Sequence, residues 1–120
     1  MYELSDRRHR FMGGGRTYIP ALVVAQCADA ATTLYGLEKP GVVELNPIVD
    51  VAMTTLGAVL GLLVLTVATL CLVVTTIEAL VRRFGDTVLT NRQLRHVGYG
   101  PHLLLTVGVV SNNVYVILAA

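Results

Sequence analysis

Asp29 lies in the middle of an apolar run, and no other acidic residue occurs between positions 18 and 37. A charge at the centre of a bilayer costs roughly 2.5–3.5 kcal/mol on insertion scales, so its presence needs a structural or functional reason. Carboxylates inside membranes often mark proton or cation paths, but a carboxyl group can also hold two helices together. A clamp between helices is the simpler interpretation, and a proton or cation conduit is its alternative.

Several other polar residues fall at the depth of Asp29 when positions are counted along the apolar runs 18–37, 48–81 and 101–120. At 1.5 Å of rise per helical residue, this depth is roughly 16 Å from the inner boundary, close to the bilayer midplane. Unpaired polar groups are most costly there, so we predict that these residues meet. The predicted intramembrane cluster consists of Asp29, Thr32, Thr33, Thr69, Asn112 and Asn113. Asn112 and Asn113 are the first expected partners of Asp29.

Residues spaced by three and four positions share one face of the first helix, and we expect this face to contact the other helices. Its members are Leu22, Gln26, Asp29, Thr33 and Gly36. On the last helix, Gly108 precedes Asn112 by four positions, and a small residue there permits a close helix contact.

A second polar motif, which we call the outer-boundary motif, stands just before the middle run. It comprises Glu44, Asn46, Pro47 and Asp50. Asn46 is a good helix N-cap, Pro47 suits the first helical position, and Asp50 places negative charge in the first turn. Glu44 has no such local reason. Solvated loop charge and an outward-facing acidic site are its two interpretations.

Catalytic and cofactor chemistry is not visible in this sequence. The three histidines lack metal-ligand spacing, and the glycines at 13–15 lack the Lys and Ser or Thr of a phosphate loop. We therefore expect a protein that is not an enzyme and that has no metal and no cofactor. The weakest alternative is a membrane enzyme that uses Glu44 and Asp50.

Transmembrane helices are the elements that must position these residues. The 120 residues are 54% apolar and 14% charged, with a mean hydropathy of +0.67, which does not suit a soluble domain of this length. Roughly 20 helical residues cross a hydrocarbon core of about 30 Å, and each run is long enough. We predict an all-α polytopic membrane protein, a small bundle of three transmembrane helices at about 18–37, 58–80 and 101–120. The net charge of +1 indicates no nucleic-acid partner.

The middle run is too long for one perpendicular crossing. Gly57 and Gly61 form a G-x-x-x-G pair, where we predict a bend or a close helix contact and a second helix that is long or broken. A shorter helix at about 47–56 then lies at the outer boundary. At the other end of the run, Glu78 and Arg82 have the spacing of a helical ion pair.

Basic residues set the expected orientation. Residues 1–17 form a basic segment ahead of the helical domain at 18–120, more arginines follow the middle run, and Lys39 stands alone in the first connection. Because Lys and Arg in short loops stay cytoplasmic, we expect a multi-pass protein of the cell membrane with its amino terminus cytoplasmic and its carboxyl terminus outside. The rival interpretation of the first run is a cleaved signal peptide, since residues 28–30 resemble a cleavage site, although the apolar sequence continues to Leu37.

The D-x-x-T-T residues from Asp29 to Thr33, the E-x-N-P residues from Glu44 to Pro47 and a last helix with Asn113 form a pattern. It resembles a family of small prokaryotic membrane proteins, the domain-of-unknown-function family numbered 5658, over about residues 18–120. The resemblance implies a three-helix architecture and a residue set, but no reaction. Members usually carry a basic residue within the second span, whereas this chain has none at 48–81.

Two functions follow as expectations. The first is a small membrane protein that acts through helix packing, as an accessory subunit or a homo-oligomer. Its partners would be the lipid bilayer and either a second copy or another membrane protein, because so short a chain forms little pocket surface by itself. The second is an oligomeric proton or cation conduit that uses Asp29.

Overall fold

The computed structural model describes residues 15–120, and every regular element within them is a helix. The elements are α2 (Gly15–Leu37), α3 (Pro47–Leu56), α4 (Ala58–Phe84) and α5 (Asn91–Ala119). The predicted all-α class is confirmed. Residues 15–120 form four helices and not a bundle of three, and α3 is the shorter helix expected at about 47–56. Positions 1–14 of the predicted basic segment lie outside the described residues.

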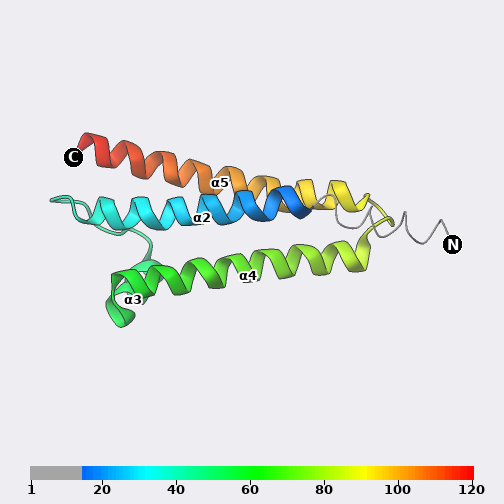
Figure 1. Cartoon of the computed structure of the whole chain (residues 1–120), viewed down its shortest axis with the longest axis horizontal. Helices are drawn as coiled ribbons and strands as arrows, with labels where there is room; N and C mark the ends of the chain where they lie inside the picture. Colours follow the sequence, from blue (N-terminus) through cyan, green and yellow to red (C-terminus); the bar gives the residue numbers. More distant parts are fainter. Residues whose placement is uncertain (1–14) are drawn as a thin grey trace.

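Three of the helices run side by side along the longest axis of the molecule (Figure 1). α2 lies between α5 and α4 in this view and contacts both, while α3 packs beside the beginning of α4. The first and last of these helices in sequence are therefore neighbours in space. This arrangement gives α2 a face toward α5, on which Asp29 lies.

The middle apolar run is divided at Gly57, which has a φ of +85° and separates α3 from α4. The chain turns back there, so that α3 rests on α4 at Gly61. A Cβ atom built on Gly61 would lie only 2.6 Å from the carbonyl oxygen of Ala52, which leaves room for glycine alone. A bend and a close helix contact were the two alternatives predicted for this glycine pair. Both occur, the bend at Gly57 and the close contact at Gly61.

Local capping explains where α3 and α5 begin. The Asn46 side chain accepts a hydrogen bond from the Ile48 backbone at 3.0 Å, with Pro47 in the first turn. α5 begins at Asn91 and continues through Pro101, so the helix extends further toward the preceding loop than the span predicted at 101–120. Its capping box joins Thr90 to Gln93, and this pair was not recognised in the sequence.

Two helices of the described part, α4 and α5, are long and apolar enough to cross a membrane. The mean hydropathy of the most apolar segment is 2.6 in α4 and 1.6 in α5. α2, which was predicted as the first span, is not among them. It carries Gln26, Asp29 and two threonines in the middle of its sequence, and these residues lower its hydropathy.

The buried core lies toward the end of the molecule where α4 finishes and α5 begins. Its residues are Leu22, Ile77, Val81 and Tyr99. Gly98 of α5 packs here, since a Cβ atom on it would lie 3.0 Å from the Ile77 side chain. The close contact predicted for Gly108 does not form within residues 15–120, because a Cβ atom there would meet none of their atoms within 4 Å. Gly108 faces away from the other helices.

Candidate functional site

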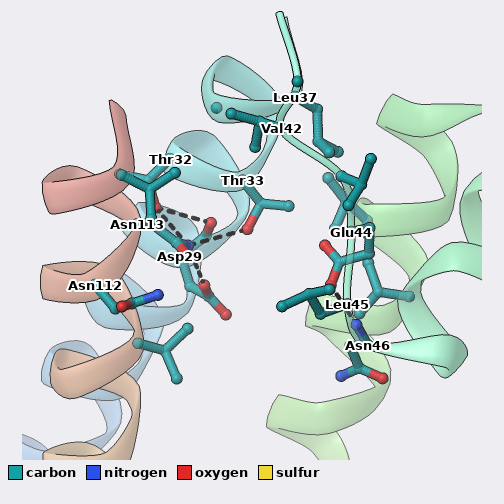
Figure 2. Close-up of a pocket in the computed structure, with 17 residues that line it drawn as sticks. Asp29, Thr32, Thr33, Leu37, Val42, Glu44, Leu45, Asn46, Asn112 and Asn113 are labelled. Carbon is teal, nitrogen blue, oxygen red and sulfur yellow. Dashed lines mark hydrogen bonds between the residues drawn. The ribbon is translucent and has the colours of Figure 1, made fainter. Parts of the chain in front are cut away.

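Asp29 of α2 is held by Asn113 of α5. The Asn113 amide nitrogen, Nδ2, lies 3.2 Å from Asp29 Oδ1 and 3.2 Å from the hydroxyl oxygens of Thr32 and Thr33 (Figure 2). The Thr32 hydroxyl also donates to the backbone carbonyl of Ala28 at 2.8 Å, which anchors it to its own helix. One amide group thus gathers three oxygen atoms of α2, and Asn113 is the asparagine that binds Asp29.

The face predicted for α2 does contact α5 along its length. Leu22 and Gln26 are buried, and a Cβ atom on Gly36 would lie 3.6 Å from the Ile117 side chain. Gln26 donates to the Thr106 hydroxyl at 3.2 Å and lies 3.3 Å from His102 Nε2. The polar residues of α2 are therefore paired mainly with polar residues of α5.

Two members of the predicted cluster behave differently from Asn113. Asn112 is exposed, although it lines the same cavity as Asp29. Thr69 does not line that cavity and makes no side-chain hydrogen bond within residues 15–120. The count along the helices predicted the depth of Thr69, but depth does not determine which way a residue on α4 points.

A half-open cavity of about 550 Å³ lies between α2, α5, the beginning of α4 and the connection at 38–46. Figure 2 shows Asp29 and Asn113 on one side of it and Glu44 and Asn46 on the other. The cavity is lined by the polar residues Asp29, Thr32, Thr33, Glu44, Asn46, Asn112 and Asn113. Both carboxylates therefore face one space.

The connection at 38–46 brings the outer-boundary motif to the intramembrane cluster, which the sequence placed apart. Glu44 Oε1 accepts a hydrogen bond from the Asn46 backbone at 2.7 Å, so this carboxylate is fixed by the turn before α3. Pro47 and Asp50 do not line the cavity. Their roles are at the beginning of α3, as predicted for helix entry.

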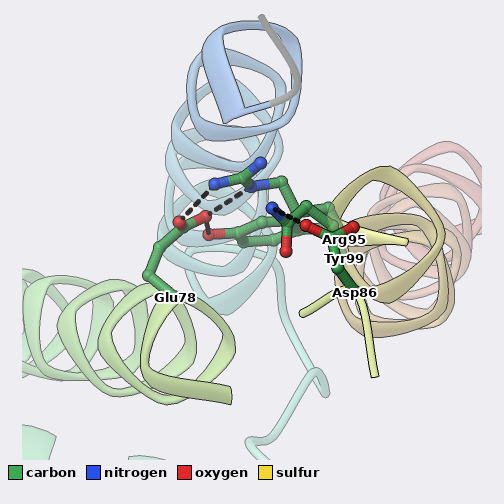
Figure 3. Close-up of polar contacts among 5 residues, drawn as sticks. Glu78, Asp86, Arg95 and Tyr99 are labelled. Carbon is green, nitrogen blue, oxygen red and sulfur yellow. Dashed lines mark hydrogen bonds and ion pairs between the residues drawn. The ribbon is translucent and has the colours of Figure 1, made fainter. Parts of the chain in front are cut away.

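A second polar group stands at the opposite end of the bundle (Figure 3). Arg95 of α5 binds the Glu78 carboxylate of α4 through two nitrogens, with Nε to Oε1 at 3.1 Å and Nη2 to Oε2 at 2.8 Å. The Tyr99 hydroxyl donates to Oε1 of Glu78 at 3.0 Å. The Tyr18 ring of α2 stacks on Tyr99 at 5.4 Å, and its hydroxyl contacts His96. This group joins all three long helices.

The ion pair predicted between Glu78 and Arg82 is wrong, because Glu78 pairs with Arg95 instead. The spacing of four residues favours Arg82 only when the helix is considered alone. Arg95 is buried against the bundle, where its planar guanidinium matches the carboxylate with two parallel hydrogen bonds. The burial of Arg95 depends on how α4 and α5 are turned toward each other, so the sequence contains no signal for this pair.

The cavity offers hydrogen-bond acceptors from two carboxylates. Within residues 15–120 no group of three or more His, Cys, Asp or Glu residues is placed to hold a metal ion. Cys27 and Cys71 are free and exposed, and neither lines the cavity. Asp29 and Glu44 present acceptor oxygens to this half-open cavity, which can hold a ligand with donor groups.

Comparison with known families adds one finding to this geometry. The sequence model of a family described as Domain of unknown function (DUF5658) matches residues 20–119, nearly all of the described part. The match includes the cavity and most of the Glu78 group. Neither the curated proteins nor the solved structures yielded a match.

Proposed function

The chain belongs to the DUF5658 family, and from this premise we propose that it is an integral membrane protein with three spans, α2, α4 and α5. It acts without catalysis, by packing against other transmembrane helices as a homo-oligomer or an accessory subunit. The connection at 38–46 and α3 lie on the outer side, since the arginines of the loop between α4 and α5 favour the cytoplasm.

The exposure of α4 is the observation that carries this proposal. Only 11% of its most apolar segment is buried within the chain, and the corresponding share for α5 is 6%. The core helix of a soluble protein would be mostly buried, whereas a helix in lipid exposes its apolar side chains. We include α2 as the third span because its polar residues Gln26 and Asp29 are turned toward α5 and away from the lipid.

One exposed face of α4 is suited to a partner helix. Ala68, Cys71, Thr75 and Ala79 are all exposed and follow one another at spacings of three and four. Small residues at such spacing let helix backbones approach closely in a membrane, where van der Waals packing drives association. Gly61, which suggested such a contact in the sequence, is already covered by α3.

Cysteine crosslinking tests this association directly. We would reconstitute the Cys27→Ser variant, which keeps Cys71 on the proposed face, and expose it to a membrane-permeant oxidant at several protein-to-lipid ratios. A disulfide-linked dimer through Cys71 is expected, and Ala79→Leu should reduce it while Val59→Leu, at an exposed position off this face, should not. A monodisperse monomer in mild detergent and in lipid, with no Cys71 crosslink and no copurified partner, would refute the packing function.

The orientation of Asp29 favours a second candidate, a proton or cation conduit. Its carboxylate faces the cavity, but the buried Leu22 and Tyr99 fill the bundle at the other end of the molecule. A conduit would therefore run between copies. Proteoliposomes should show a proton or cation flux that Asp29→Asn abolishes while the helical content is kept, and equal flux in both proteins would exclude this candidate.

A further inference from the structure

The cavity between α2, α5 and the connection at 38–46 has the size of a small-molecule site. Its volume of about 550 Å³ falls within the roughly 300–1,000 Å³ of ligand pockets. A bare ion would leave most of it empty. The two walls that Figure 2 shows on opposite sides of the cavity each carry one carboxylate, Asp29 on α2 and Glu44 on the connection.

Within residues 15–120, no basic residue that lines the cavity balances its charge. Its lining residues include two carboxylates and no Lys, Arg or His. Lys39 is the basic residue of the connection, and its amino group lies over the Tyr35 ring at 5.1 Å from the centroid, outside the cavity. A cavity with walls of low dielectric and one sign of charge attracts an ion of the opposite sign.

Each carboxylate is held by one oxygen and presents the other. Asn113 donates to Asp29 Oδ1, and within residues 15–120 no group donates to Oδ2. The Asn46 backbone donates to Glu44 Oε1, and within the same part of the chain Oε2 receives no hydrogen bond. These contacts fix both side chains and leave an acceptor oxygen on each for a donor in the cavity.

The remaining lining favours an organic cation over a hydrated metal ion. Eight of the lining residues are Val or Leu, such as Leu62 and Val109, which match hydrocarbon. A metal ion such as Ca²⁺ takes six to eight oxygen ligands, and within the described chain no suitable group of side chains exists. We propose that this cavity binds an organic ammonium ion, with its charged nitrogen between Asp29 and Glu44 and its carbon part against the valines and leucines.

Ligand binding in nanodiscs of phosphatidylglycerol, a lipid without an ammonium group, tests this proposal. The probe is phenethylammonium, and its neutral control is phenethyl alcohol, with binding followed by calorimetry and saturation-transfer NMR. We expect binding of the ammonium probe that is at least tenfold tighter than that of the alcohol, because only the cation meets the carboxylates. Potassium at the same concentration should not displace it.

The variants assign the binding to the two carboxylates. Asp29→Asn and Glu44→Gln should each weaken binding of the ammonium probe, and the loss of affinity for Asp29→Asn should be tenfold or more. Asp50→Asn should leave the binding unchanged, because Asp50 lies outside the cavity. Circular dichroism checks that Asp29→Asn and Glu44→Gln both keep the helical content of the unchanged protein. Three results would each overturn the proposal: equal binding of the probe and the alcohol, displacement of the probe by potassium, or unchanged probe binding when Asp29→Asn and Glu44→Gln are combined in one variant.

A final comparison identifies the source of the ammonium group. If a lipid headgroup occupies the cavity, adding phosphatidylethanolamine to the nanodiscs should weaken binding of the probe severalfold. If the ligand is a soluble amine, the addition should leave binding of the probe unchanged. Both results keep the proposed chemistry. The crosslinking of Cys71 measures helix association separately, so the two proposals fail independently.

Discussion

Arg95 holds Glu78 with two nitrogen atoms, at 3.1 and 2.8 Å, and so ties the start of α5 to the end of α4. The side chains are 9% and 23% exposed, which places the pair largely out of solvent. Tyr99 adds a third hydrogen bond to the same carboxylate. Such a pair fixes the relative rotation of two helices whose other contacts are apolar and non-directional.

Loss of the Arg95 contact should destabilise the protein. Arg95→Gln leaves the Glu78 carboxylate without its cation, and we expect a loss of about 1.5–3 kcal/mol, the range for a hydrogen bond to a charged group. Thermal unfolding in detergent micelles, followed by circular dichroism, measures it. The matched variant Arg82→Gln should change stability by less than about 0.5 kcal/mol, since Arg82 is exposed. Equal losses of stability in the two variants would instead support the Glu78–Arg82 ion pair that was expected from the sequence.

The two adjacent asparagines of α5 should respond differently to truncation. Asn113→Ala removes the amide that gathers Asp29, Thr32 and Thr33, so it should cost about 0.6–1.7 kcal/mol, as measured for hydrogen bonds between membrane helices. Asn112→Ala should cost little, because Asn112 is exposed. Both would be compared by unfolding in the same micelles. A larger loss for Asn112→Ala would contradict the observed pairing.

A methyl group at Gly61 should displace α3. The added Cβ atom would lie 2.6 Å from the Ala52 carbonyl oxygen, and backbone atoms cannot rotate out of its way. Gly61→Ala should therefore speed hydrogen exchange of the α3 amides at least tenfold, as read by mass spectrometry. Gly108→Ala is the control, because the space there is open. Slow exchange in both variants would show that α3 does not depend on this contact.

The cap of α3 should be worth about 1 kcal/mol. Asn46→Ala removes the acceptor for the Ile48 backbone, and an N-cap residue replaced by Ala costs 0.5–2 kcal/mol. We expect faster exchange confined to the first turn of α3, with α4 and α5 unchanged. Asn46→Asp keeps an acceptor at the same position and should restore the protection. Faster hydrogen exchange throughout α4 would contradict this prediction, because it would mean that the Asn46 cap stabilises more than the first turn of α3.

Helix rise and capping made part of this structure predictable from the sequence. The depth count brought Asp29 to the level of Asn113, and the Asn46-Pro47 pair marked the beginning of α3. Both depend on short-range geometry, since the rise of a helix and the preference of an N-cap are local properties. The break at Gly57 follows from the same kind of information.

The rotation of helices and the path of the connection could not be predicted in this way. Between positions 58 and 77, α4 has no charged residue and its threonines do not all lie on one face, so its sequence does not tell where Thr69 points. For the same reason the sequence did not predict that Glu78 pairs with Arg95, because this pair depends on how α4 and α5 are turned toward each other. Glu44 lies in a segment without periodicity, and only the folded connection brings it opposite Asp29.

The pairing of Asp29 with Asn113 has a consequence for synthesis of the chain. The two residues are separated by 84 positions, so for the three-span arrangement proposed above Asp29 enters the membrane well before its partner exists. At translation rates of 5–20 residues per second, the delay is on the order of 4–17 s. During that interval Asp29 has no Asn113 amide to bind, so the clamp between the first and last helices forms only when the last helix emerges.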